Sequence, residues 1–241
     1  GVVYKLPLLA ANDFLPDLDN IPADICAKAK LLVLNYPNSP TGRTAPPEFY
    51  EDVVRFAKQH NVVVVQDAAH AVLSYDRAPN SFLATPGAKE VGVEVHSLSK
   101  GFDMIGWRLG WVCGHERLVR AFADVKDNCD SGQFLAIQKA AETALANPEI
   151  PQGIRRKYQR RLEKLVDLLD RCGFQCTMPG GTYFLYTPSP KGIEGGPTFE
   201  NAEAASQYLI TEQSICTVPW DDAGAYLRFS VTYEAADEAA E

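Results

Sequence analysis

Residues 46–70 read PPEFYEDVVRFAKQHNVVVVQDAAH. The prolines suit the first turn of a helix, and the apolar residues that follow recur at the spacing of one helical face. The residues expected on that face are Phe49, Val53, Phe56 and Ala57. The helix predicted over 46–61 leads into a β-branched run at 62–67, which is typical of a parallel strand buried on both faces. With the apolar strand expected at 30–36, this segment predicts a βαβ unit and an α/β fold with a mostly parallel sheet.

The rest of the chain predicts one long helix and a second group of strands. The further strands are expected at 92–97, 109–113, 175–177, 182–187 and 226–231, and the further helices at 116–127, 133–146, 150–173 and 201–213. Residues 150–173 carry apolar side chains on one side and basic ones opposite, which predicts a long amphipathic helix. Because the segment lies between the two groups of strands, we expect this helix to connect two domains. The sequence predicts a large domain within 1–148, then the connecting helix and a smaller α+β domain within 149–241.

The stretch HSLSKGFDMIGWRLG at 96–110 gathers groups of one chemistry beside one strand end. The amine of Lys100 can condense with an aldehyde to form a Schiff base. Ser97 and Ser99 can donate hydrogen bonds to a phosphate, and Arg108 can bind its oxygens with two parallel hydrogen bonds. An aldehyde and a phosphate in one ligand indicate pyridoxal phosphate as the cofactor.

Two other segments complete the predicted cofactor site. Asp67 ends the strand at 62–67, and a carboxylate there can keep the pyridine nitrogen of the cofactor protonated. The turn NYPNSPTG at 35–42 follows the strand at 30–36, and either Asn38 or Ser39 can hydrogen-bond the phenolic oxygen of the cofactor. The amide favours Asn38, whereas spacing favours Ser39.

These motifs, in this order, resemble the class I/II aminotransferases of fold type I. The resemblance implies that Lys100 carries the cofactor, with phosphate-binding Ser97 three residues before it and Arg108 eight residues after it. It also implies that Asp67 is the partner of the pyridine nitrogen. In the stretch AYLRFSVT, it implies that Arg228 binds the carboxylate of the substrate.

The resemblance is strongest to one branch of that family. The stretches KDNCDSGQF, PGGTYFLY and VPWDDAGAYLRFSV look most like the branch of LL-diaminopimelate aminotransferase and alanine/aspartate aminotransferase. The branch implies transfer of an amino group between an amino acid and a 2-oxo acid, in lysine biosynthesis, by a homodimer. A lyase or decarboxylase of the same fold type, and a homologue without catalytic activity, are the alternatives.

Two positions depart from the family pattern. His70 stands where the family has a tyrosine whose hydroxyl binds the phenolic oxygen of the cofactor. Ser39 stands immediately before Pro-Thr-Gly, where the family has an asparagine, and Asn38 lies one residue earlier. Both departures concern the hydrogen bond to the phenolic oxygen, so they affect the electronic properties of the cofactor more than its binding.

Length sets a further expectation. The chain has 241 residues, whereas members of the family are considerably longer, and the resemblance begins midway through their large domain. We expect a fragment that lacks the N-terminal region of the large domain and ends within the small one. Whether such a fragment binds the cofactor or dimerises stays open.

Charge and cysteine content limit the partners. A net charge of −8 argues against nucleic acid and anionic membranes as partners, and no apolar run reaches the length of a membrane span. The six cysteines contain no CxxC pair, which indicates reduced thiols and a cytoplasmic location. No spacing of His, Cys and Asp indicates a metal site, so none is predicted.

Overall fold

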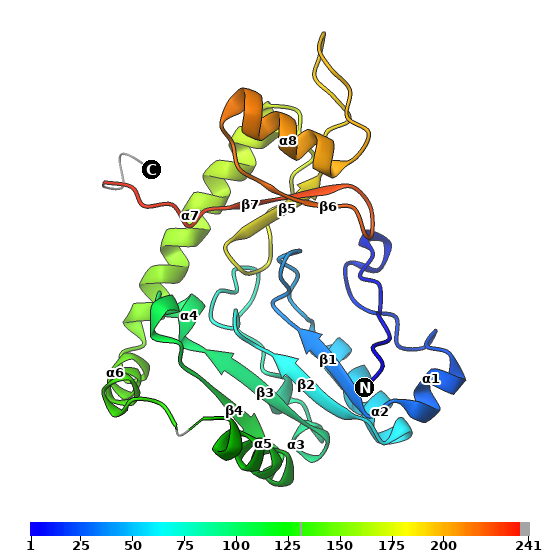
Figure 1. Cartoon of the computed structure of the whole chain (residues 1–241), viewed down its shortest axis with the longest axis vertical. Helices are drawn as coiled ribbons and strands as arrows, with labels where there is room; N and C mark the ends of the chain where they lie inside the picture. Colours follow the sequence, from blue (N-terminus) through cyan, green and yellow to red (C-terminus); the bar gives the residue numbers. More distant parts are fainter. Residues whose placement is uncertain (131, 237–241) are drawn as a thin grey trace.

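The structure is a computed structural model that describes residues 1–130 and 132–236. Its helices are α1 (Ala23–Lys28), α2 (Pro47–His60), α3 (Ala88–Val91), α4 (Leu98–Gly101), α5 (Glu116–Cys129), α6 (Leu135–Leu145), α7 (Glu149–Arg171) and α8 (Ala202–Gln213). Its strands are β1 (Leu31–Asn35), β2 (Val63–Asp67), β3 (Gly92–Ser97), β4 (Gly110–Gly114), β5 (Phe184–Pro188), β6 (Val218–Trp220) and β7 (Tyr226–Ser230). Figure 1 shows one group of elements around β1–β4 and a second group around β5–β7, with α7 running from one to the other.

The first sheet has the order β1-β2-β3-β4. The strands β1, β2 and β3 are parallel, and β4 is antiparallel to β3. Because Asn35 pairs with Asp67, and Ser97 pairs with Gly110, the carboxyl ends of the parallel strands meet the start of β4 at one edge. The predicted βαβ unit and mostly parallel sheet are confirmed.

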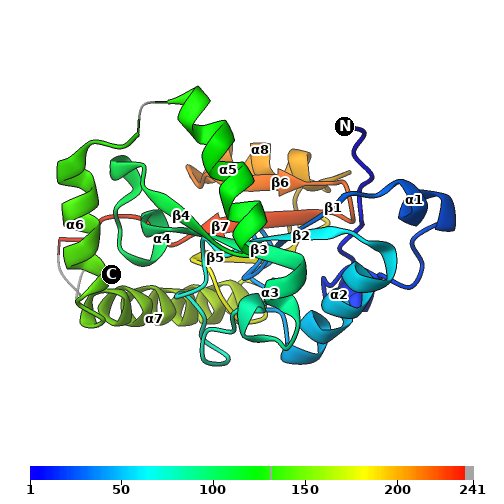
Figure 2. The same cartoon turned by 90° about the horizontal axis from the view of Figure 1, so that it is seen from below.

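Helix α2 covers one face of this sheet. It has Pro47 in its first turn and ends at His60, and the next residue, Asn61, has a left-handed φ of 53°. Val53 and Val64 are fully buried in the core between α2 and β2, and burying each such side chain contributes about 1.5–3 kcal/mol. Figure 2 shows α2 and α3 together on one side of the first sheet. Of the helical face predicted from the sequence, Phe56 is only partly buried.

The second sheet has the order β5-β7-β6 and is antiparallel throughout. Its core joins Leu185 of β5 and Leu227 of β7 to Leu162 of α7 and Ala205 of α8. The helix α7 also contacts α4, so it links the second sheet to the end of β3. The predicted boundary at residues 148 and 149 falls between α6 and α7. The division into two domains stays a prediction, and residues 237–241 of the second domain lie outside the described ranges.

The prediction of a strand at 175–177 is wrong. The backbone there pairs with side chains instead of a neighbouring strand, since Cys176 N donates to Asp170 Oδ1 and Gln175 O accepts from Thr187 Oγ1. The sequence also did not predict the three-residue strand β6 or the four-residue helix α4.

Candidate active site

The first sheet brings the predicted cofactor residues to one edge. Asp67 ends β2 and Ser97 ends β3, while Arg108 lies two residues before β4. The carboxyl ends of parallel strands are where open α/β sheets place their ligands. The backbone and side chains tie this edge together, because Asn35 Nδ2 and Gln66 Nε2 both donate to the carbonyl of Asp67, at 3.2 and 3.1 Å.

Lys100 lies on α4, which follows β3 without a loop. The Ser97 side chain caps this helix by accepting from Ser99 N at 3.1 Å, so its hydroxyl proton stays available. The ammonium of Lys100 is half-buried and lies 5.5 Å from the centroid of the Tyr183 ring. It makes no hydrogen bond or ion pair with any residue in 1–130 or 132–236. A lysine amine held in this way is accessible for condensation with an aldehyde.

The predicted phosphate ligands lie beside one another. Arg108 Nη1 lies 3.5 Å from the hydroxyl of Ser99 and donates to the carbonyl of Ile105 at 3.1 Å. Arg108 itself is exposed and has a left-handed φ of 51°. Since a guanidinium has five N–H donors, Arg108 retains donors for a phosphate next to Ser97 and Ser99.

In the turn after β1, the side chains of Asn38 and Ser39 differ in their hydrogen bonding. The amide of Asn38 is buried and used inside the turn: Oδ1 accepts from the backbone and hydroxyl of Thr41, and Nδ2 donates to the carbonyl of Asn35. The hydroxyl of Ser39 makes no hydrogen bond within the described part of the chain. This arrangement favours Ser39 as the residue that faces the cofactor, in agreement with its spacing.

Asp67 is the last residue of β2, and His70 lies three residues after it. Asp67 Oδ1 accepts from the backbone of Ala69 at 3.0 Å, which orients the carboxylate and leaves the other oxygen for a ligand. His70 is 5% exposed, and its Nδ1 is buried without a hydrogen-bond partner among the described residues. Burial and the nearby charge of Lys100 lower the pKa of His70 to about 4, so the imidazole is neutral at pH 7.

The second sheet supplies the opposite wall of the site. The ring of Tyr183 lies 5.4 Å from the ring of His70, and the guanidinium of Arg228 lies 4.2 Å above the ring of Phe184. Arg228 Nε is buried without a hydrogen-bond partner, and Arg228 has no ion pair among the described residues. An arginine left without an anion in this position is suited to bind the carboxylate of a ligand.

Sequence reasoning did not identify Tyr183 and Phe184 as site residues. They follow the PGGT segment at 179–182, which packs against the loops of the first sheet: Gly181 N donates to Gly42 O, and Thr182 N donates to Leu73 O, both at 2.9 Å. Paired glycines directly before a strand were the available signal, since they allow such close approach of two backbones.

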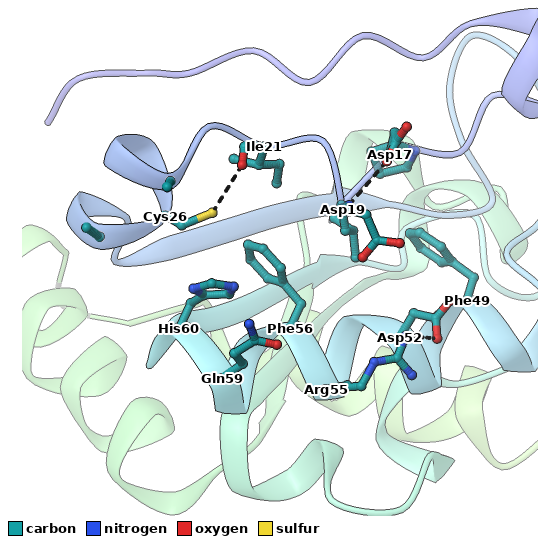
Figure 3. A pocket seen from close by; sticks show the side chains of 14 residues that line it. Asp17, Asp19, Ile21, Cys26, Phe49, Asp52, Arg55, Phe56, Gln59 and His60 are labelled. Carbon is teal, nitrogen blue, oxygen red and sulfur yellow. Dashed lines mark hydrogen bonds and ion pairs between the residues drawn. The ribbon is translucent and has the colours of Figure 1, made fainter.

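A cavity of about 500 Å³ lies elsewhere, between α2 and the segment that contains α1. Figure 3 shows that its polar side chains include Asp17, Asp52 and Arg55. These groups are engaged locally, since Arg55 Nη2 pairs with Asp52 Oδ1 at 2.6 Å and Asp17 accepts from Asn20. None of the predicted site residues lines this cavity, so it is not part of the candidate active site.

The residues at the sheet edge fit pyridoxal phosphate. Two buried polar atoms lack partners among the described residues, His70 Nδ1 and Arg228 Nε. The ring of Tyr183 lies next to both His70 and the amine of Lys100. The hydroxyls and guanidinium that suit a phosphate lie on the adjoining segment, Ser97 to Arg108. The six cysteines of the chain are free thiols. No helix in the described ranges is long and apolar enough to cross a membrane.

Comparisons with known proteins agree with this site. The family model described as "Aminotransferase class I and II" matches residues 1–241. LL-diaminopimelate aminotransferase from Methanocaldococcus jannaschii is 56% identical over 241 residues, which cover 99% of this chain and 57% of that protein. The enzyme of the same name from Methanococcus maripaludis is 52% identical over 235 residues, covering 98% of this chain and 56% of that protein.

A solved structure shares the fold. The solved structure of apo-BacF from Bacillus subtilis superposes with a TM-score of 0.90 at 34% identity, covering 96% of this chain and 62% of that one. The chain thus spans somewhat more than half the length of the curated relatives that it matches. By sequence and by fold, the chain belongs to the class I and II aminotransferase family.

Proposed function

We propose that the protein is a pyridoxal-phosphate-dependent aminotransferase that moves an amino group between an amino acid and a 2-oxo acid. The observation that carries this proposal is the amine of Lys100, which has no hydrogen bond or ion pair among the described residues and lies 5.5 Å from the ring of Tyr183, the ring that also contacts His70. The names of the relatives support LL-diaminopimelate as the amino acid. The family resemblance implies lysine biosynthesis as the pathway.

Each residue at the edge has one role in binding. Ser97, Ser99 and Arg108 hold the phosphate, and Asp67 pairs with the pyridine nitrogen. Ser39 and the neutral His70 lie toward the phenolic oxygen, where an imidazole or a hydroxyl can donate a hydrogen bond.

Two residues act on the substrate. Arg228 binds the α-carboxylate with two parallel hydrogen bonds, which orients the bond between the α-carbon and its hydrogen. Lys100 Nζ takes the α-proton as a general base. The cofactor supplies an electron sink for the negative charge that develops at the α-carbon.

Assembly as a homodimer and a cytoplasmic location belong to the same proposal. Both rest on the family resemblance, and the location is also supported by the free thiols.

The first experiment locates the cofactor. The chain is incubated with pyridoxal phosphate, reduced with borohydride and digested, and the adduct is mapped by mass spectrometry. We expect the adduct on Lys100, its loss in Lys100→Ala, and its retention in Lys139→Ala, which removes an exposed lysine paired with Glu142. Labelling spread over several exposed lysines, with no preference for Lys100, contradicts the assignment.

The second experiment tests turnover. Because this chain covers 57% of the M. jannaschii relative, it can replace the matched region of that protein in a hybrid. We expect the hybrid to convert LL-diaminopimelate only when a 2-oxo acid is present. Turnover without a 2-oxo acid would indicate the lyase alternative, and a hybrid that binds the cofactor but converts no amino acid would indicate a homologue without catalytic activity.

A further inference from the structure

A second group of chemically reactive side chains lies on the strands β3 and β4, upstream of Lys100. Glu94 and His96 are two residues apart on β3, so their side chains point to the same face of the sheet. Cys113 of β4 is the register partner of Glu94 across the antiparallel pair, which brings it to that same face. The carboxylate oxygen, the imidazole nitrogen and the thiol sulfur lie within 4.8 Å of one another.

The surroundings hold two of these three side chains in place. The carboxylate of Glu94 is 2% exposed and accepts hydrogen bonds from Ser81 Oγ at 2.9 Å and from the backbone of Leu83 at 3.4 Å. The ring of His96 stacks on Trp111, with 5.2 Å between ring centroids and 10° between ring planes. Contacts of this kind fix the orientation of side chains that bind a metal.

Two of the three donor atoms already lie side by side, and Glu94 Oε2 also accepts from Ser81 Oγ. His96 Nε2 lies 3.0 Å from Glu94 Oε2, a separation that two ligands of one metal ion also adopt. The thiol of Cys113 is half-buried and makes no hydrogen bond within residues 1–130 and 132–236.

We propose that Glu94, His96 and Cys113 form a binding site for one transition-metal dication of the zinc type. A thiolate, an imidazole and a carboxylate together select Zn²⁺ or Co²⁺ over Mg²⁺ and Ca²⁺, which prefer oxygen ligands alone. On binding, the Cys113 thiol releases its proton to solvent, and the neutral His96 ring carries its one proton on Nδ1 in place of Nε2, by exchange with solvent. The Glu94–His96 hydrogen bond is thereby replaced by two metal–ligand bonds. The fourth position is filled by water or by a further ligand.

The position of this site gives it a consequence for the rest of the protein. A metal ion there joins β3 to β4. Ser97 is the last residue of β3, and Arg108 lies two residues before the start of β4. The site would thus fix the two strands that carry the proposed phosphate ligands. It does not depend on the proposed function, because it uses none of the residues that contact the cofactor.

This site was not predicted from the sequence because no short spacing links Cys113 to Glu94 and His96. Glu94 and Cys113 are far apart in the chain and come together only through the antiparallel register. A search for metal-binding motifs with closely spaced ligands therefore passes over it.

The test titrates the metal-free chain with Co²⁺, in a buffer without phosphate and with a reductant that does not bind metals. We expect a thiolate-to-cobalt charge-transfer band that saturates at one equivalent and is displaced by Zn²⁺. In Cys113→Ser the band should disappear, and in His96→Gln the affinity for Co²⁺ should fall at least tenfold. Cys129→Ser and His115→Gln are matched controls outside the cluster, and both should bind as the parent does.

Several outcomes would overturn the proposal. They are the absence of a saturable band in the parent chain, a band that persists in Cys113→Ser, and a band that is lost equally in Cys129→Ser. Circular dichroism and thermal unfolding of each variant show whether it is folded before the metal titration. Glu94→Gln is not the primary variant, because its carboxylate also holds Ser81 and Leu83.

Discussion

The ring of His70 lies edge-on to the ring of Tyr183, with 5.4 Å between the centroids. His70 comes from the end of β2 and Tyr183 precedes β5, so this contact joins the two sheets at the candidate active site. Tyr183 also approaches Lys100, whose ammonium lies 5.5 Å from the same ring. The aromatic ring therefore excludes water from the imidazole, while the lysine places a positive charge near it.

The stability of the chain should depend on pH through His70. Its folded-state pKa of about 4 lies below the ordinary value of 6.5, because burial and the Lys100 charge disfavour the imidazolium. Between these two values the unfolded chain binds more protons than the folded chain, so stability falls as the pH drops from about 6.5 toward 4. We expect this residue to remove about 2 kcal/mol of unfolding free energy between pH 7 and pH 4.5.

Urea unfolding at pH 7 and pH 4.5 measures this loss. His70→Phe should reduce the difference between the two pH values by about 2 kcal/mol, because its ring does not titrate. The control His60→Gln changes a histidine that packs on Phe56 of α2 and should leave the difference as in the parent. An unchanged pH difference in His70→Phe would show that His70 is not buried in its neutral form.

The turn after β1 gives opposite predictions for neighbouring residues. Asn38→Ala should lower the unfolding free energy by about 1–3 kcal/mol, because the Asn38 amide makes the internal hydrogen bonds of the turn. Ser39→Ala should leave stability unchanged within about 0.5 kcal/mol. In the cofactor-binding hybrid, Ser39→Ala should weaken the retention of pyridoxal phosphate on dialysis, followed by absorbance. Normal retention in Ser39→Ala would exclude Ser39 as a ligand.

Local spacing explains what the sequence could predict. Ser97, Lys100 and Arg108 lie within twelve consecutive residues at the end of one strand, so their proximity follows from the sequence itself. The βαβ unit was equally local, because Phe49, Val53 and Ala57 face the strand that directly follows their helix. Proximity of this kind can be predicted because both partners belong to one short segment, so it does not depend on which distant segments meet in the fold.

The rest depends on distant segments that meet only in the folded chain. Tyr183 and Phe184 reach His70 because the PGGT segment packs against loops far away in the sequence. Cys113 reaches Glu94 only through the antiparallel register of β3 and β4. The expected strand at 175–177 failed for a related reason, since side chains of Asp170 and of Thr187 in β5 satisfy its backbone in place of backbone pairing.

Two arginines of the second sheet region should respond differently to replacement by methionine. Arg161 is 4% exposed and donates to the carbonyls of Val231 and Tyr233, at 3.0 and 2.6 Å. Arg161→Met leaves these acceptors unsatisfied and should lower the unfolding free energy by about 2–4 kcal/mol. Arg228 has a buried Nε without a partner, so Arg228→Met should cost less than about 1 kcal/mol.

Chemical unfolding of the two variants side by side measures this contrast. In the hybrid, Arg228→Met should also raise the KM for the amino acid by roughly 10–100-fold, since a charge-assisted hydrogen bond contributes about 1.5–3 kcal/mol. A loss of stability in Arg228→Met as large as that in Arg161→Met would mean that Arg228 is a structural residue.

The close approach between the turn after β1 and the PGGT segment should be visible in glycine variants. Gly42 has a φ of +70°, and a Cβ there would lie 2.5 Å from Cβ of Pro179. Gly42→Ala therefore combines left-handed strain with a steric clash and should lower the unfolding free energy by about 2–4 kcal/mol.

The matched control is Gly153→Ala in α7, where a Cβ meets nothing within 4 Å. Because alanine favours a helix over glycine, this control should raise the unfolding free energy by about 0.5–1 kcal/mol. Thermal and urea unfolding of both variants decide the matter: equal effects at the two positions would mean that the turn and the PGGT segment do not pack together in solution.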